Sequence, residues 1–227
     1  MTFRPLLLAI IPAMISGQFS SAQGEDDKKL TVRALILAPG SVNRELHTLA
    51  AETKNLAGPV LVGARGLSEP LAPGARKFSF AVPDEKAEGG FSPIAQVVLP
   101  ANGNQFIVLL EPVEKTLKCH VINAEARDFG NDSTLFFNAT DIPIGAELGS
   151  KKILIPPRKP TIVPAPRREG ERPWFQVAFY ESKNGQASMF SSTRWPHRNA
   201  SRGYLFFYRS MPSGRIAYEG VDEPLKL

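Results

Sequence analysis

Cysteine is almost absent from this chain of 227 residues, which contains only Cys119. An intramolecular disulfide is therefore excluded, and no cysteine stands where a lipid anchor would be attached behind an N-terminal signal. Alternation along Leu117–Ile122 places Cys119 on the same face of a strand as Leu117 and Val121. We therefore expect a buried thiol without a reactive role.

Long apolar runs are also missing, apart from a short one near the N-terminus. Arg4 precedes the apolar core Leu6–Ile15, and the small residues Ser20–Ala22 come before Gln23. This order is typical of a cleavable secretory signal, with residues 1–22 removed. An apolar core of this length is too short for a transmembrane helix, which needs about 20 residues. The sequence thus predicts an exported protein, periplasmic or secreted, without a transmembrane segment in the mature chain.

Catalytic and metal-binding motifs are scarce. The three histidines, His47, His120 and His197, each lack a second histidine at the spacing of a zinc site. Asp128–Gly130 spells the metal-binding tripeptide of kinases, but no glycine-rich phosphate loop accompanies it. Neither a G-x-S-x-G nor an S-x-x-K motif of serine hydrolases occurs. We expect no cofactor and no metal.

Charge is distributed unevenly along the chain. Residues 23–150 contain 12 Lys and Arg against 16 Asp and Glu, a net charge of −4. Residues 151–227 contain 14 against 6, a net charge of +8. In an exported protein this basic part would meet an anionic polysaccharide, an envelope polymer or another exported protein rather than nucleic acid. A solvated basic surface without a partner is the alternative.

Most apolar runs are short, rich in β-branched or aromatic residues, and bounded by Pro, Gly, Asn or Asp, as in strands. The predicted strands are Leu30–Leu37, Val60–Val62, Lys77–Val82, Ile94–Leu99, Gln105–Glu111, Leu117–Asn123, Ser133–Asn138, Lys151–Ile155, Trp174–Tyr180, Ala187–Trp195, Gly203–Arg209 and Arg215–Glu219. Their spacing predicts an all-β fold of antiparallel β-sandwich architecture, with one large or two small sandwich units behind the signal. The segment Ser41–Leu56 fits a helix and a strand equally well.

Turn residues predict three hairpins. Asn-Gly pairs in Ala101–Asn104 and Lys183–Gln186 tolerate the positive φ angles of tight turns, and Met211–Gly214 connects the last two predicted strands. The predicted domain division is a first β unit at residues 23–115 and a second, basic unit at residues 116–227, with a single domain over residues 30–227 as the alternative. A weak internal similarity, an echo of Gly63-Ala64 in Gly145-Ala146, would relate the two units as a repeat with an offset of 82 residues.

Residues 156–173 contain six prolines interspersed with basic residues. Because proline removes backbone donors and stiffens the chain, this segment is predicted to be an exposed connection or a charged edge strand. Its candidate ligand-binding residues are Arg158, Lys159, Arg167, Arg168 and Arg172.

A second cluster places Arg194, Trp195, Arg198 and Arg202 just before the aromatic run Gly203–Arg209. Aromatic rings stack on sugars and cations, and arginine binds carboxylate or sulfate groups through two hydrogen bonds, so these four residues are further candidates. Simple packing is the competing interpretation, with the arginines in water. On this packing interpretation, Gly203–Arg209 is a central strand covered on both faces. Leu205 and Phe207 lie on one side, and Tyr204, Phe206 and Tyr208 lie on the other.

These observations favour an exported, non-catalytic binding or structural protein that contacts anionic polymers or another exported protein through its basic C-terminal part. The alternative is an extracellular hydrolase acting on a polysaccharide or ester, with strand-end acids and a histidine such as His197 in its site. A metal-dependent enzyme is a third hypothesis.

Overall fold

The computed structural model describes residues 29–37, 43–52, 55–113, 116–125, 129–130, 132–168, 170–183, 185–197, 200–211 and 213–224. Within these ranges no residue lies in a helix, so the all-β prediction is confirmed and no helix suited to crossing a membrane is found there. The predicted signal at residues 1–22 and the candidate Arg198 lie outside the described residues.

The described part of the chain forms fifteen strands. They are β1 (Thr31–Ile36), β2 (Arg44–Ala50), β3 (Leu56–Val62), β4 (Lys77–Pro83), β5 (Phe91–Val98), β6 (Gln105–Val113), β7 (Thr116–Asn123), β8 (Ser133–Asn138), β9 (Ile144–Leu148), β10 (Lys151–Ile155), β11 (Pro160–Pro164), β12 (Trp174–Lys183), β13 (Gln186–Pro196), β14 (Ser201–Arg209) and β15 (Ile216–Pro224).

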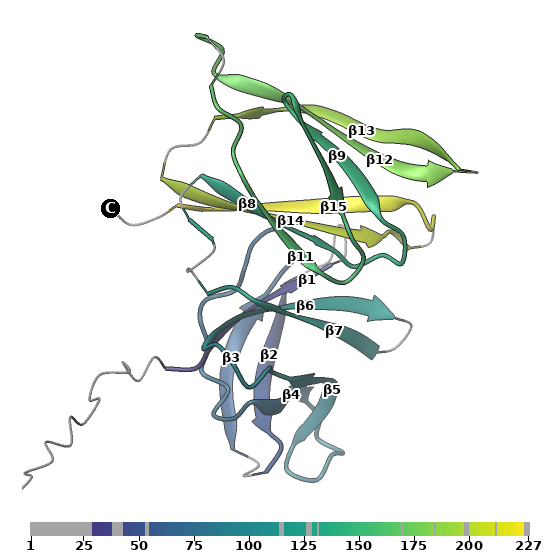
Figure 1. Ribbon diagram of the computed structural model, residues 1–227. Coiled ribbons are helices and arrows are strands. Elements are labelled where there is room, and N and C mark those ends of the chain that lie inside the picture. Colours follow the sequence, from purple (N-terminus) through teal and green to yellow (C-terminus); the bar gives the residue numbers. More distant parts are fainter. Residues whose placement is uncertain are drawn as a thin grey trace, which may run out of the picture.

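These strands make four sheets (Figure 1). Sheet A has the order β1-β6-β7 and sheet B the order β3-β2-β4-β5, while sheet C is β11-β8-β14-β15 and sheet D is β10-β9-β12-β13. Neighbouring strands run antiparallel except in the pairs β1–β6 and β8–β14, which are parallel. The prediction of largely antiparallel sheets is confirmed, and the two parallel pairs were not foreseen.

Both halves of the chain repeat one topology. Sheet B and sheet D have equivalent strand orders, and β1-β6-β7 corresponds to β8-β14-β15 with the same parallel first pair. The second half adds only the edge strand β11. Equivalent strands begin roughly 100 positions apart. The echo at an offset of 82 is therefore not the structural repeat, since Gly63 follows β3 whereas Gly145 lies within β9.

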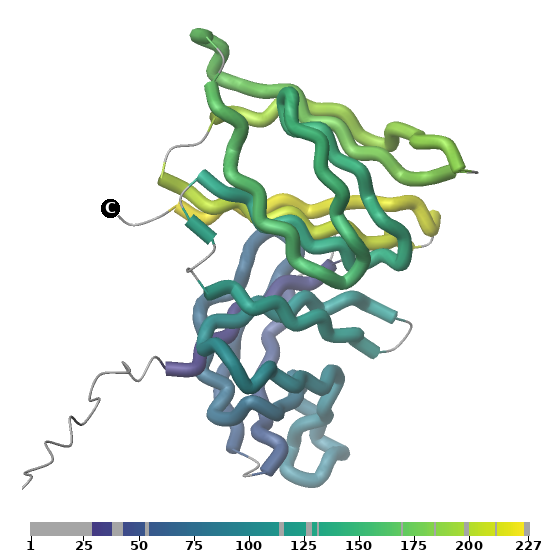
Figure 2. The backbone as a smooth tube through the Cα atoms, viewed as in Figure 1, coloured from purple at the N-terminus to yellow at the C-terminus, as the bar shows by residue number. Residues whose placement is uncertain are grey.

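The chain completes sheets A and B before it enters sheets C and D, as the change from purple and teal to green and yellow shows (Figure 2). The predicted unit boundary between residues 115 and 116 falls at the connection from β6 to β7, two strands that pair within sheet A. By hydrogen bonding, the passage from one pair of sheets to the other lies between β7 and β8.

The sheets stack in the order B, A, C, D, with buried apolar side chains between successive layers (Figure 1). Strand β6 shows why sheet A is covered on both sides. Phe106 and Val108 point toward sheet B, and the alternating residues Ile107 and Leu109 point toward sheet C. Because side chains alternate along a strand, a continuous apolar run such as this fills two cores.

Strand β14 occupies the equivalent place in sheet C. Leu205 and Phe207 lie in the core facing sheet D, together with the half-buried Trp195, while Tyr204 and Phe206 lie in the core facing sheet A. The expected central strand with two covered faces is therefore confirmed.

Two of the three predicted hairpins are confirmed. β12 and β13 pair directly across Lys183 and Gln186, and β14 pairs with β15 across the Met211–Gly214 connection. The hairpin at Ala101–Asn104 is wrong: Gly103 has a φ of 89°, but this turn carries the chain from β5 in sheet B to β6 in sheet A. A turn motif fixes a local reversal without fixing the sheet that the next strand joins.

Other local predictions also have clear outcomes. The ambiguous segment Ser41–Leu56 contains a strand, β2, rather than a helix. Strand β11 within the proline-rich segment is an edge strand of sheet C, as expected. Cys119 is half-buried rather than fully buried as expected. It packs against the core between sheets A and B, and burial raises the pKa of its thiol to about 11, which supports an unreactive thiol.

Candidate functional site

The sequence-predicted candidates fall in separate parts of the fold. Arg172 and Arg194 meet at the beginning of β12, Arg158 lies at the junction of sheets A and C, and Arg202 lines a cavity between the same two sheets. The structure therefore does not gather all the candidates into one site.

The exposed face of β12 and β13 brings two arginines onto one tryptophan. In the antiparallel register Trp174 lies opposite Pro196 and Gln176 lies opposite Arg194, so Arg194 is a diagonal neighbour of Trp174 on the same face. The Cζ atom of Arg194 is 4.4 Å from the centroid of the Trp174 ring, and that of Arg172 is 5.8 Å from it. Both distances allow cation–π attraction, which holds two positive charges beside a half-buried indole.

Alternation along β12 separates an apolar face from a face with aromatic and polar groups. Val177 and Phe179 point into the core between sheets C and D. Trp174, Gln176 and Tyr180 alternate with them and lie on the outer side of sheet D. At the usual rise of a strand, Trp174 and Tyr180 are roughly 20 Å apart. We call this surface, together with Ser192, Arg194 and the adjoining Arg172, the β12–β13 face.

Polar groups occupy the middle and the far end of the β12–β13 face. Gln176 Nε2 donates to Ser192 Oγ at 2.7 Å, and the Tyr180 hydroxyl donates to Glu147 Oε2 at 2.9 Å. Lys152 Nζ lies 3.0 Å from Glu147 Oε1. The contacts with Lys152 and Tyr180 lower the pKa of Glu147, and the same carboxylate raises the pKa values of Lys152 and Tyr180. This end of the face is thus neutralised, whereas the Trp174 end is positive.

Two further candidates adjoin the positive end. Pro166 packs against Gly149, whose N–H donates to the carbonyl oxygen of Gln176 at 2.8 Å. Arg167 and Arg168 follow Pro166 directly and are exposed. Four predicted arginines are therefore carried by the beginning of β12 and the segments beside it.

Trp195 and Lys159 have different environments. The Trp195 ring stacks on that of Phe136, with centroids 6.3 Å apart and planes at 10°, and contacts the Phe179 ring at 6.1 Å. Its half-buried side chain therefore packs against the core between sheets C and D. Lys159 is exposed in the connection between β10 and β11.

Arg158 joins a histidine and a glutamate at the junction of sheets A and C. His120 Nε2 lies 2.7 Å from Glu111 Oε2, and Arg158 Nη1 lies 3.2 Å from both ring nitrogens of His120 and 3.9 Å from the Glu111 oxygen. We call these three residues the Glu111 cluster. The hydrogen bond between His120 and Glu111 lowers the pKa of Glu111, although burial acts in the opposite direction.

The backbone at Arg158 adopts the left-handed conformation, with a φ of 62°. This conformation is unfavourable for a residue with a side chain, and it is held here by the Arg158 N–H, which donates to the Asn138 carbonyl oxygen at 2.8 Å. The resulting turn directs the guanidinium back toward His120. Arg158 thereby ties the second half of the chain to β6 and β7 of the first half.

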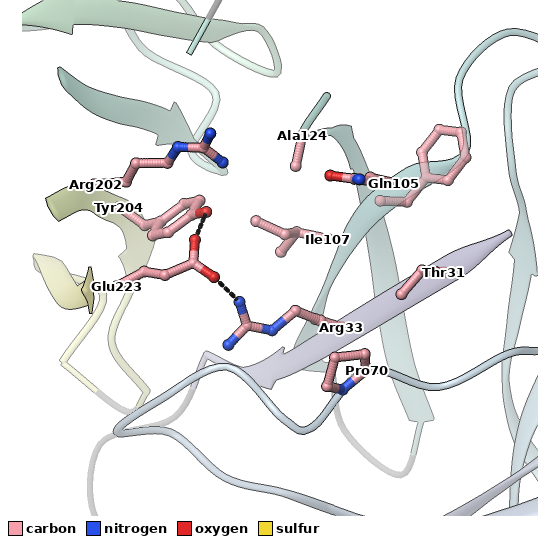
Figure 3. Close-up of a pocket in the computed structure, with 10 residues that line it drawn as sticks. Thr31, Arg33, Pro70, Gln105, Ile107, Ala124, Arg202, Tyr204 and Glu223 are labelled. Carbon is pink, nitrogen blue, oxygen red and sulfur yellow. Dashed lines mark hydrogen bonds and ion pairs between the residues drawn. The ribbon is translucent and has the colours of Figure 1, made fainter. Parts of the chain in front are cut away.

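Arg202 lies in a cavity of about 240 Å³ between sheets A and C (Figure 3). Its Cζ atom is 5.2 Å from the centroid of the buried Phe129 ring, and its Nε is buried without a hydrogen-bond partner among the described residues. Arg202 is thus half-buried rather than fully surrounded by water as the packing interpretation expected. Its place at the start of β14 turns it toward the layer below, which an alternation pattern within one strand does not reveal.

Below Arg202, an ion pair joins the two halves (Figure 3). Arg33 on β1 forms an ion pair and hydrogen bond with Glu223 on β15, and its Nε donates to the Ser68 carbonyl oxygen at 3.1 Å. The Tyr204 hydroxyl donates to the other Glu223 oxygen at 2.5 Å. Burial, with this hydrogen bond, raises the pKa of Tyr204.

Sequence reasoning missed polar groups that form contacts between the two halves of the chain. Arg33, Glu111 and Glu223 are far apart in sequence and sit in strand patterns without any motif. The signal available for Trp174 was its position two residues after Arg172, at the beginning of a predicted strand. Pairing of β12 with β13, which follows from the Lys183–Gln186 hairpin, would then have placed Arg194 beside it.

Comparison of the sequence with models of known protein families and with curated protein sequences finds no match. Within the described ranges, no group of three or more His, Cys, Asp or Glu side chains is placed to hold a metal ion. The function is therefore inferred from the geometry of this chain alone.

Proposed function

We propose that this chain is an exported, non-catalytic binding protein whose β12–β13 face contacts an acidic polysaccharide. Two sandwich units, formed by sheets A with B and by sheets C with D, provide the rigid support for this face. Binding needs an exposed platform in which aromatic rings stack on sugar rings and guanidinium groups attract carboxylate or sulfate groups.

One observation carries the proposal: Arg194 and Arg172 both lie on the Trp174 ring, at 4.4 and 5.8 Å from its centroid. The stacking orients each guanidinium on the surface while its charge stays available to an acidic group. Arg167 and Arg168 add positive charge beside them, in a half of the chain with a net charge of +8.

The polar middle of the face supports a sugar polymer rather than a compact anion. Gln176 and Ser192 offer amide and hydroxyl groups along the strand, and Tyr180 presents a second aromatic ring roughly 20 Å from Trp174. A long, flat row of this kind suits an extended chain with repeated hydroxyl and anionic groups.

The test is retention on a heparin column in a salt gradient. We expect the R172Q/R194Q variant to elute at lower salt than the wild type and to bind heparin about tenfold more weakly, because two oriented charges are lost. The matched control R44Q/K86Q removes two exposed charges from the first half and should elute close to the wild type. Equal elution of R172Q/R194Q and the wild type would overturn the proposal.

A hydrolase is the second candidate function, and the 2.7 Å contact between His120 and Glu111 is the observation that favours it. The described contacts of His120 are with Glu111, Arg158 and the Phe137 ring, and the histidine is only 7% exposed. Hydrolysis of p-nitrophenyl acetate that is lost in H120Q and retained in H197Q would support an enzyme. Equal rates in both variants and the wild type would exclude this site.

A further inference from the structure

We propose that the cavity between sheets A and C is a second binding site, for a small organic monocarboxylate. This site is independent of the β12–β13 face, because it is lined by other residues and lies two layers further into the molecule. The environment of Arg202, the charge of the lining and the size of the cavity support this site.

Arg202 is held in place by a ring rather than by a carboxylate. Its guanidinium lies over the Phe129 ring, which is itself fully buried and packs edge-on against Tyr204 at 5.1 Å. The Arg202 Nε atom is buried and makes no hydrogen bond with the described residues. A buried charged donor without a partner is unfavourable, and an acceptor supplied by a ligand would satisfy it.

The charges of the lining residues favour a ligand with one negative charge. Three of these residues are charged: Arg33, Arg202 and Glu223. Arg33 and Glu223 neutralise each other, and the Tyr204 hydroxyl donates a hydrogen bond to the same carboxylate. One positive charge, that of Arg202, thus remains in excess in the lining. Glu223 would repel a dianion such as phosphate, whereas a monocarboxylate can form two parallel hydrogen bonds with a guanidinium.

The remaining lining indicates the body of the ligand. Pro70, Ile107 and Ala124 supply an apolar wall, and Figure 3 shows Ile107 and Ala124 facing the space beside Arg202. A volume of about 240 Å³ equals that of roughly eight water molecules. A carboxylate with a compact apolar body, such as an aromatic ring, fits both the volume and the wall.

Benzoate is the probe, and its binding to the full chain is measured by isothermal titration calorimetry. We expect benzoate to bind the wild type, and R202Q to bind it at least tenfold more weakly because the charged partner is lost. The matched control is R209Q, on the same strand, where Arg209 pairs with the exposed Asp141 at 3.0 Å. It should bind benzoate as the wild type does.

A second variant tests the cavity without removing the charge. A124F fills part of the space and should also abolish benzoate binding while inorganic phosphate remains a poor ligand for the wild type. Binding of benzoate that is unchanged in R202Q or in A124F would overturn the proposal. So would phosphate binding more tightly than benzoate, or no benzoate binding to the wild type. Benzoate binding does not depend on heparin binding, so either proposal can be overturned without the other.

Discussion

Sheets B and D are topological equivalents whose inner faces are alike and whose outer faces differ. In both sheets phenylalanines of the third strand in the sheet order fill the core, Phe80 on β4 and Phe179 on β12. On the outer side, Lys77 lies opposite Val98 at the beginning of β4, where β12 has Trp174 opposite Pro196.

This difference separates what the fold requires from what it leaves open. The same strand order forms with and without a tryptophan on the outer face, so the fold does not need Trp174 or the arginines around it. Apolar residues on an inner face are sufficient to define a layer, because burial drives the packing. The β12–β13 face is therefore the part of the second half that calls for a functional explanation.

The largest predicted effect tests whether the two inner faces are equivalent. Phe80 and Phe179 are both fully buried, so F80A and F179A should each lower the free energy of unfolding by about 3–5 kcal/mol. Urea denaturation followed by circular dichroism measures both values. A decrease in the free energy of unfolding below about 1 kcal/mol for either variant would show that the two inner faces are not equivalent.

The contact between the halves gives the next effect. Glu223 accepts hydrogen bonds from Arg33 and Tyr204, so E223Q leaves a charged donor poorly satisfied. Since about a quarter of each ion-pair side chain is exposed, the expected loss is about 1–3 kcal/mol rather than that of a fully buried pair. Urea denaturation beside the control E45Q, on exposed Glu45, provides the measurement. Equal stability of E223Q and E45Q would contradict this role.

Acid should weaken the other contact between the halves. The pKa of Glu111 is lower in the folded protein than its ordinary value of 4.5, so its ionised form stabilises the fold above that pH. This contribution, about 1–2 kcal/mol, should be lost as the pH falls below about 4.5. The free energies of unfolding of the wild type and E111Q, measured between pH 7 and pH 3, should differ less as the pH falls. A difference that grows with acid would reverse the assigned sign.

The smallest predicted effect on stability is on the outer face. Trp174 is half-buried and outside the core clusters, so W174L should change the free energy of unfolding by less than about 1 kcal/mol. The same variant should bind heparin several-fold more weakly, because the ring that orients Arg172 and Arg194 is removed. A large loss of stability without a loss of binding would assign Trp174 to the fold instead.

Strands and their faces were predictable from the sequence because alternation is a local property. The pattern in Gly203–Arg209 predicted both covered faces of β14 correctly. Strand partners were less accessible: the Ala101–Asn104 turn was assigned to a hairpin, although it joins two sheets. Pairings such as β1 with β6 join residues about 74 positions apart and have no local signal.

The candidate sites divide in the same way. The sequence points to Arg172 as part of a basic, proline-rich segment and to Arg194 as a neighbour of aromatic residues, but their meeting on Trp174 depends on the register of β12 and β13. The cavity around Arg202 was not predictable, because the strands of sheet A that line it are distant in sequence. The Arg33–Glu223 pair spans 190 positions and could not be anticipated from composition or motifs.

The central claim is that the outer face of sheet D, and not that of sheet B, binds an acidic polysaccharide. Amide chemical shifts of the labelled protein, measured during titration with a heparin-derived hexasaccharide, test it most directly. The account predicts that the largest shifts occur at Trp174–Tyr180 and Ser192–Arg194, with little change in β2–β5. Largest shifts in β2–β5, or no shifts on β12 and β13, would contradict it.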